Sequence, residues 1–240
     1  MKTWWFVATL PVLAAVLTSF GIAGDDSGRP FFRYPQVLAP REYHHLVQVS
    51  AAKLPEDVVE AASSLIRAPL FEYQALYGLP HGLSIEGGFS TNIVTYHFAL
   101  GPRWQHSFDP FAVAVGYDVA YWFGQIKSID GFDTSVRGWL NYPNLSFGYR
   151  VGEVSITLRG EMIVSTHASY FVGDTEVASD VNTVAGYSVA LYVEQPLWKD
   201  NYVLIGVKSN HTKLYYPLWA AFSTFDRSFY IPEFIMGFIL

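Results

Sequence analysis

The sequence predicts an all-β fold, an antiparallel transmembrane β-barrel of about ten strands with a short N-terminal helix, from three observations. The first is alternation over Phe111–Gln125, where bulky residues such as Tyr117 and Phe123 hold the odd positions and small or charged residues such as Ala114 and Asp118 the even ones. A strand with one bulky and one small face suits a wall between lipid and a polar lumen. The second is a hydrophobic content of 51% without an apolar run after residue 23 that is long enough for a spanning helix. The third is an aromatic content of 17%, as the interfacial girdles of such barrels require.

Charge and cysteine content exclude several classes of function. The net charge of −6 and the lack of a Lys/Arg cluster argue against nucleic acid as a partner. Without cysteine the chain has no disulfide, thiol nucleophile, thiolate metal site or lipoprotein attachment point, and no metal or other cofactor is predicted. The 240 residues contain no obvious linker and predict one domain; an exported soluble β-sandwich is the competing architecture.

Residues 1–23 have the organisation of a secretory signal peptide. Lys2 precedes an apolar run over Trp4–Phe20, and small residues lead to an expected cleavage after Ala23. A retained membrane anchor is the alternative. Export followed by barrel-like strands predicts the outer membrane of a Gram-negative-type cell as the location.

Residues 24–70 are predicted to form an N-terminal arm that contains a first strand and a short helix. Asp25–Pro40 is punctuated by Gly and Pro and indicates irregular structure. Tyr43–Ala51 alternates weakly and is the candidate first strand. Leu54–Arg67 has apolar residues at helical spacing with Pro55 near its start, which favours a helix. Capping or plugging the barrel mouth and packing beside the barrel are both open for this helix.

Residues 71–240 are predicted to form the barrel, with Gly152-Glu153 as a tight turn and His167–Asp180 as a longer loop. Some bulky residues break the small-face pattern and are expected near the rims or inside the lumen: Trp122, Tyr192, Leu204, Ile235 and Ile239. The further strands are expected over 71–77, 83–90, 93–104, 111–125, 135–151, 154–165, 182–195, 202–216 and 234–240.

The export signal, the alternating strands and an aromatic-rich last strand ending at Leu240 together resemble bacterial outer-membrane β-barrels. The resemblance covers about residues 71–240. The last residue of such proteins is typically Phe, so Leu240 departs from the pattern. The resemblance implies a periplasmic C-terminus, short periplasmic turns and longer outer loops. It also implies outer-membrane lipid, lipopolysaccharide and the barrel-assembly machinery as partners. Loop parity requires Tyr43–Ala51 to cross as well, which gives ten strands; eight is the second choice.

Charged residues fall on the small face of the predicted strands. Placing Arg or Lys at the bilayer midplane costs roughly 2–4 kcal/mol, so a one-residue register slip is penalised. At about ten strands side chains fill most of the interior, which predicts a salt-bridged lumen rather than a wide channel. The predicted lumen network contains Glu86, His97, Arg103, Asp118, Arg150, Arg159, Glu161, Glu194 and Lys208.

Two polar groups are candidate chemical sites. The adjacent His44 and His45 point to opposite faces of a strand, so no metal site is predicted there. Ser209, Asn210 and His211 form the richest polar cluster, and alternation places the serine and the histidine on one face, which permits a Ser/His pair. No catalytic residue is predicted from this cluster alone.

These features favour an integral outer-membrane barrel with a charged, largely filled lumen and a structural, docking or assembly role. A protein partner would meet it at extracellular or periplasmic loops. The alternative is a narrow pore or transporter for small solutes, and the second alternative is an outer-membrane lipid hydrolase. No enzyme activity is predicted.

Overall fold

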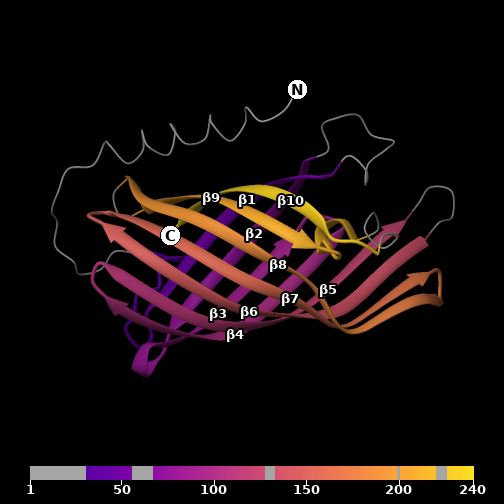
Figure 1. Ribbon diagram of the computed structural model, residues 1–240, viewed down its shortest axis with the longest axis horizontal. Helices are drawn as coiled ribbons and strands as arrows, with labels where there is room; N and C mark the ends of the chain where they lie inside the picture. Colours follow the sequence, from indigo (N-terminus) through magenta and orange to yellow (C-terminus); the bar gives the residue numbers. More distant parts are fainter. Residues whose placement is uncertain (1–30, 56–66, 128–132, 199–200, 220–225) are drawn as a thin grey trace.

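The computed structural model describes residues 31–55, 67–127, 133–198, 201–219 and 226–240, which form a closed, antiparallel β-barrel (Figure 1). The predicted signal peptide lies outside the described residues, as do residues 56–66 of the predicted helix. The strands are β1 (Tyr43–Lys53), β2 (Arg67–Gly78), β3 (Leu83–Thr91), β4 (Thr95–Phe108), β5 (Phe111–Lys127), β6 (Asp133–Val151), β7 (Val154–Val172), β8 (Thr175–Trp198), β9 (Asn201–Thr212) and β10 (Phe229–Ile239).

Each strand pairs with the next one in the sequence, and β1 closes the barrel against β10. Leu46 lies opposite Ile239, and Ala52 lies opposite Glu233. Tyr43–Ala51 is therefore a strand of the wall, and the predicted ten-strand barrel is confirmed. Among the described residues, no helix has the length and hydropathy to span a bilayer.

Strand β5 carries the alternation that the sequence predicted. Val115 and Tyr117 are about half exposed on the outer face, whereas Ala114 and Ala120 are buried. The outer faces of the other strands continue this apolar surface around the barrel, as a membrane-facing belt requires. It includes Val47, Val49, Phe71, Tyr73, Phe98, Leu100, Val119, Leu145, Phe147, Leu158, Met162, Val189, Val207, Phe234, Met236 and Phe238.

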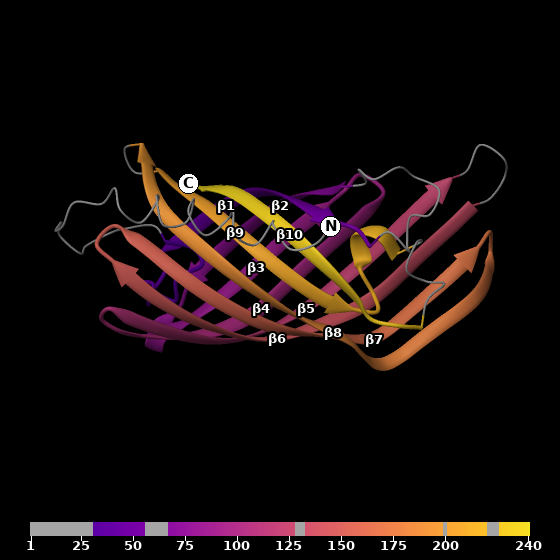
Figure 2. The same ribbon diagram turned by 45° about the horizontal axis from the view of Figure 1, so that its top comes forward.

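We call the end of the barrel that holds the C-terminus the base and the opposite end the top. Base connections are short, and Gly152 adopts the positive φ of 59° that its two-residue turn requires. The prediction of a long loop over His167–Asp180 is wrong, because β7 and β8 continue there as paired strands. They end at a tight turn at Gly173, which also has a φ of 59°. Strands β7 and β8 extend past most of the wall at the top (Figures 1 and 2). The polar and small composition of this hairpin hides its period-two pattern.

The start of β2 also differs from the prediction. Arg67 was expected to end a helix, but its backbone pairs with Lys53 as the first residue of β2. The pairing continues through Pro69, opposite Ala51. Cross-strand hydrogen bonding overrides local helical spacing here, since the closed barrel leaves no free strand edge.

Two segments outside the strands, one before β1 and one between β9 and β10, fold into the barrel rather than over its surface. The first is residues 31–38 at the base, which we call the base segment; Phe31, Phe32 and Leu38 are buried. The second is residues 213–219 at the top, the top segment, which contains the 3-10 turn Tyr216–Leu218. This turn lies within the outline of the barrel (Figure 2). The lumen is therefore occupied from both ends.

Candidate functional site

Glu86 of β3 lies at the centre of the buried charges in the lumen. Its carboxylate accepts hydrogen bonds from Arg159 Nη1 at 3.1 and 3.2 Å. Arg33 Nη1 of the base segment lies 3.3 Å from the same group, and Arg103 Nη1 lies 3.6 Å away. Three guanidinium groups from the arm, β4 and β7 thus converge on one carboxylate.

Arg159 connects this centre to two further carboxylates. Its Nη2 donates to Asp118 Oδ2 at 3.1 Å, and its Nε lies 3.4 Å from Glu161 Oε2. Lys208 Nζ donates to Glu161 Oε1 at 2.5 Å. A buried ion-pair network contributes little net stability, but loss of one partner leaves an uncompensated buried charge. The network therefore fixes the relative positions of β3, β5, β7 and β9.

Glu194 of β8 binds the backbone of the base segment. Its Oε1 accepts the N–H groups of Phe32 and Arg33, both at 2.8 Å, and its Oε2 accepts that of Tyr34 at 2.8 Å. Ser155 Oγ donates to Oε2 at 2.9 Å. One fully buried carboxylate is thus stabilised by four hydrogen-bond donors, three of which belong to the base segment.

The wall is shaped to receive the base segment. The Tyr34 ring occupies the space beside Gly148, where an added Cβ would lie 2.6 Å from the ring. Arg103 Nη2 donates to the Arg33 carbonyl at 3.0 Å, and His44 Nδ1 lies 3.0 Å from the Phe31 carbonyl. The segment is therefore held by β1, β4, β6 and β8 as a fitted plug.

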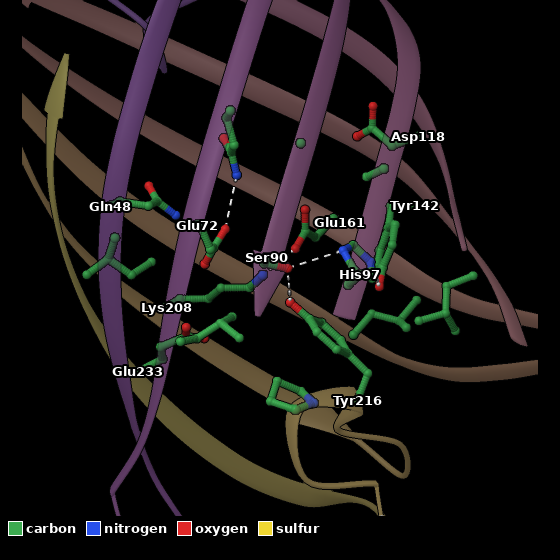
Figure 3. A pocket seen from close by; sticks show the side chains of 18 of the residues that line it. Gln48, Glu72, Ser90, His97, Asp118, Tyr142, Glu161, Lys208, Tyr216 and Glu233 are labelled. Atoms are coloured by element: carbon green, nitrogen blue, oxygen red, sulfur yellow. Dashed lines mark hydrogen bonds and ion pairs between the residues drawn. The ribbon is translucent and has the colours of Figure 1, made fainter. Parts of the chain in front are cut away.

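The top segment is fixed by a separate polar and aromatic cluster. The Tyr216 ring stacks on His97 with centroids 4.4 Å apart and an interplanar angle of 15°. The Tyr216 hydroxyl and Ser90 Oγ are 2.9 Å apart, while His97 Nε2 and the Tyr142 hydroxyl are 3.1 Å apart (Figure 3). Burial raises the pKa of the Tyr216 hydroxyl well above its usual value, so the group is neutral at physiological pH.

The top segment also depends on space in the wall. The Trp219 indole occupies the position that a side chain at Gly124 would take. Trp219 is buried, and the Asn92 amide donates to the Pro217 carbonyl. Glycines on the inner face therefore make room for both inward segments, Gly148 for the base segment and Gly124 for the top segment.

The residues predicted for the lumen network do not all lie in one group. Glu86, Arg103, Asp118, Arg159, Glu161 and Lys208 meet as described, while His97 joins the top cluster and Glu194 the base segment. Arg150 lies at the base rim, where its Nη2 pairs with Asp109 Oδ1 at 2.8 Å.

The polar cluster Ser209, Asn210 and His211 is divided between the two faces of β9. Asn210 is buried in the lumen and donates to Glu233 Oε2 at 3.1 Å. Its neighbours alternate to the outer face, where the His211 ring lies 5.2 Å from that of the half-exposed Tyr187. The cluster therefore does not present its amide beside the serine and the histidine.

Several lumen residues were missed by the sequence analysis. Arg33 belongs to an irregular arm, where no periodicity indicates which way a side chain points. Glu72 alternates with Phe71 and Tyr73 in a predicted strand, so the same rule that selected Glu86 could have selected it. Glu233 precedes the predicted start of the last strand. Within the described ranges, no group of three or more His, Cys, Asp or Glu residues is arranged to hold a metal ion.

The closed strand topology, the exposed apolar belt and the charged interior define a transmembrane β-barrel of the outer-membrane type. No family model matches the chain, and no curated protein matches it either. Among solved structures, the chain is similar to the translocator domain of autotransporter NalP from Neisseria meningitidis, with 8% identity, a TM-score of 0.43, and coverage of 98% of this chain and 94% of that one.

It is also similar to Neisserial surface protein A, at 12% identity and a TM-score of 0.38 over 82% of this chain and 96% of that one. Outer membrane phospholipase A from Escherichia coli matches at 12% identity and a TM-score of 0.37, over 88% of this chain and 98% of that one. Since these TM-scores are below 0.5, the class of the protein rests on its own strand topology and belt.

Proposed function

We propose that the protein is an integral outer-membrane barrel that serves a structural, docking or assembly role with its lumen kept closed. The base would face the periplasm, and the signal peptide would be removed after Ala23. Outer-membrane lipid and lipopolysaccharide would surround the belt, and the barrel-assembly machinery would insert it. The single observation that carries the proposal is the base segment, whose three consecutive N–H groups are bound by Glu194 inside the lumen.

A lumen that served as an open pore would not need these contacts. The base segment contributes Arg33 to the central ion network, so the plug and the wall share one set of buried charges. The top segment closes the other end through Tyr216 and Trp219. Loops at the two ends would then be the parts available to a protein partner.

A narrow pore for small solutes is the second candidate. A cavity of about 140 Å³ lies between the base segment and the top segment, so displacement of both segments would open a charged path. A lipid hydrolase has less support, because Asn210 is separated from Ser209 and His211. Lipids that remain unhydrolysed after incubation with the purified protein would argue against this activity.

Single-channel recording in planar bilayers tests the closed lumen. The wild-type protein should insert without steady conductance steps. A variant in which residues 31–38 and 213–219 are replaced by glycine-serine linkers should conduct, which also proves that insertion is detected. Steady wild-type steps equal to those of the variant would contradict the proposal and favour the pore.

A further inference from the structure

The lumen cavity between the two inward segments is lined by charged, amide and aromatic side chains from several strands. Glu72, Glu161, Lys208 and Glu233 lie around the same space, which Tyr216 borders from the top segment (Figure 3). These residues come from β2, β7, β9, β10 and the top segment. The cavity, about 140 Å³, can hold several water molecules or one small organic molecule.

The positive charges that line the cavity are already engaged. Arg33 and Arg159 pair with Glu86, and Arg159 also pairs with Asp118 and Glu161. Lys208 Nζ lies 2.5 Å from Glu161 Oε1. Lys208 also lies opposite Glu233 in the strand register and between Glu72 and Glu233 in Figure 3, but its ammonium group is paired with Glu161.

Among the described residues, two carboxylates beside Lys208, those of Glu72 and Glu233, accept hydrogen bonds from neutral donors only. Glu233 is bound by Ser50 Oγ and by Asn210 Nδ2, the latter at 3.1 Å. Glu72 accepts a hydrogen bond from Gln74 Nε2 at 3.1 Å. Within the part of the chain that the structure describes, neither carboxylate has a cation within 4 Å. Two unpaired carboxylates in a low-dielectric interior are costly and favour a bound positive charge.

A further acceptor lies beside them without a partner. The side-chain oxygen of Gln74 is buried on the cavity wall, and no donor reaches it from the described residues. A buried acceptor without a donor costs about 1–3 kcal/mol. The free hydrogen-bonding capacity of this side of the cavity is therefore acceptor capacity, which a ligand with several N–H donors would satisfy.

The remaining surface near these acceptors is apolar and aromatic. Leu70 and Ile235 are buried in the wall, and Leu214, Tyr215 and Tyr216 approach from the top segment. Aromatic rings beside carboxylates favour organic cations over hydrated inorganic ions. The site therefore matches both parts of an organic amine. Its carboxylates suit the charged group, and its apolar side chains suit a short hydrocarbon chain.

We propose that the cavity binds a small organic ammonium ion, with the ammonium group at Glu72 and Glu233 and the hydrocarbon body against Ile235 and Tyr215. This inference goes beyond the closed lumen and is independent of conductance. The bound amine would also add contacts between the top segment and the wall.

Equilibrium binding of n-butylammonium to the folded protein in detergent micelles tests the site, with n-butanol, butyrate and sodium chloride as the comparison solutes. Isothermal titration of each solute into the protein measures binding, and thermal unfolding with each solute present measures stabilisation. Saturable binding and a raised unfolding temperature are expected for n-butylammonium only. Glu72→Gln and Glu233→Gln should each weaken binding about tenfold or more.

The control variant is Glu176→Gln, which removes one carboxylate from the exposed β7–β8 hairpin and should bind like wild type. Far-UV circular dichroism and gel mobility without heating confirm that each variant is folded, and either single variant suffices if the other fails to fold. Absence of saturable binding overturns the proposal. Equal binding of sodium ions or butyrate, or full binding by both glutamine variants, overturns it as well.

Discussion

At the residue scale, Arg159 and Glu194 have different tasks although both were predicted as lumen charges. Arg159 contacts three carboxylates and joins strands of the wall, whereas Glu194 binds the backbone of a segment that is not part of the wall. The sequence indicates which face each residue occupies, because period-two alternation fixes that face. It does not indicate the partner, since partners are set by barrel closure and by the path of the arm.

Replacement of Arg159 by alanine should destabilise the barrel by about 3–5 kcal/mol, because Glu86, Asp118 and Glu161 all lose a partner in a buried site. Arg159→Lys should recover part of this loss, since one ammonium group cannot reach all three. Urea-induced unfolding in lipid vesicles measures both variants. A change below about 1 kcal/mol in the alanine variant would contradict the network.

Replacement of Glu194 by glutamine should loosen the base segment without unfolding the wall. Each charge-assisted hydrogen bond contributes about 1.5–3 kcal/mol, so the amides of Phe32, Arg33 and Tyr34 should exchange at least about tenfold faster. Hydrogen exchange read by mass spectrometry on the peptide that contains them tests this. Glu176→Gln is the matched control, and unchanged exchange in the Glu194 variant would refute the anchoring role.

At the element scale, the strands were predictable and the inward segments were not. Strand β5 and the closing strand β10 show their alternation in the sequence, because one face meets lipid and the other a packed lumen. The base segment has no such pattern, and the predicted long loop at 167–180 is a paired hairpin. Backbone hydrogen bonds stabilise that hairpin at its full length without an apolar face to signal it.

The two inward segments should respond separately to loss of the glycine beside each. Gly148→Val should displace Tyr34 and speed tryptic cleavage after Arg33, whereas Gly124→Val should displace Trp219. The second change should speed cleavage after Lys213 by at least about tenfold, the factor that 1.4 kcal/mol produces.

Gly160→Val is the control for both variants, because an added Cβ at this position meets no atom within 4 Å. Its cleavage rates should equal those of wild type. Simultaneous acceleration at both sites in either glycine variant would indicate general unfolding and would contradict the separate attachment of the segments.

At the scale of the whole molecule, the exposed apolar belt and the buried charges are two consequences of one strand register. Val119 lies on the belt and Asp118, next to it in β5, lies in the lumen. Val119→Arg should therefore reduce folding stability in vesicles by about 2–4 kcal/mol, as for a cation near the bilayer midplane. Urea-induced unfolding measures it, and a loss below about 0.5 kcal/mol would contradict the placement of this face in lipid.

The central claim is a lipid-facing wall around a closed lumen, and adjacent residues of β3 test it most directly. Since the chain has no cysteine, nitroxide labels at Gly87→Cys on the outer face and Gly88→Cys on the inner face report one position each. Power-saturation measurements in vesicles should find the Gly87 label accessible to oxygen and the Gly88 label protected from a water-soluble nickel complex. Free access of that complex to the Gly88 label, or to both labels, would contradict the account.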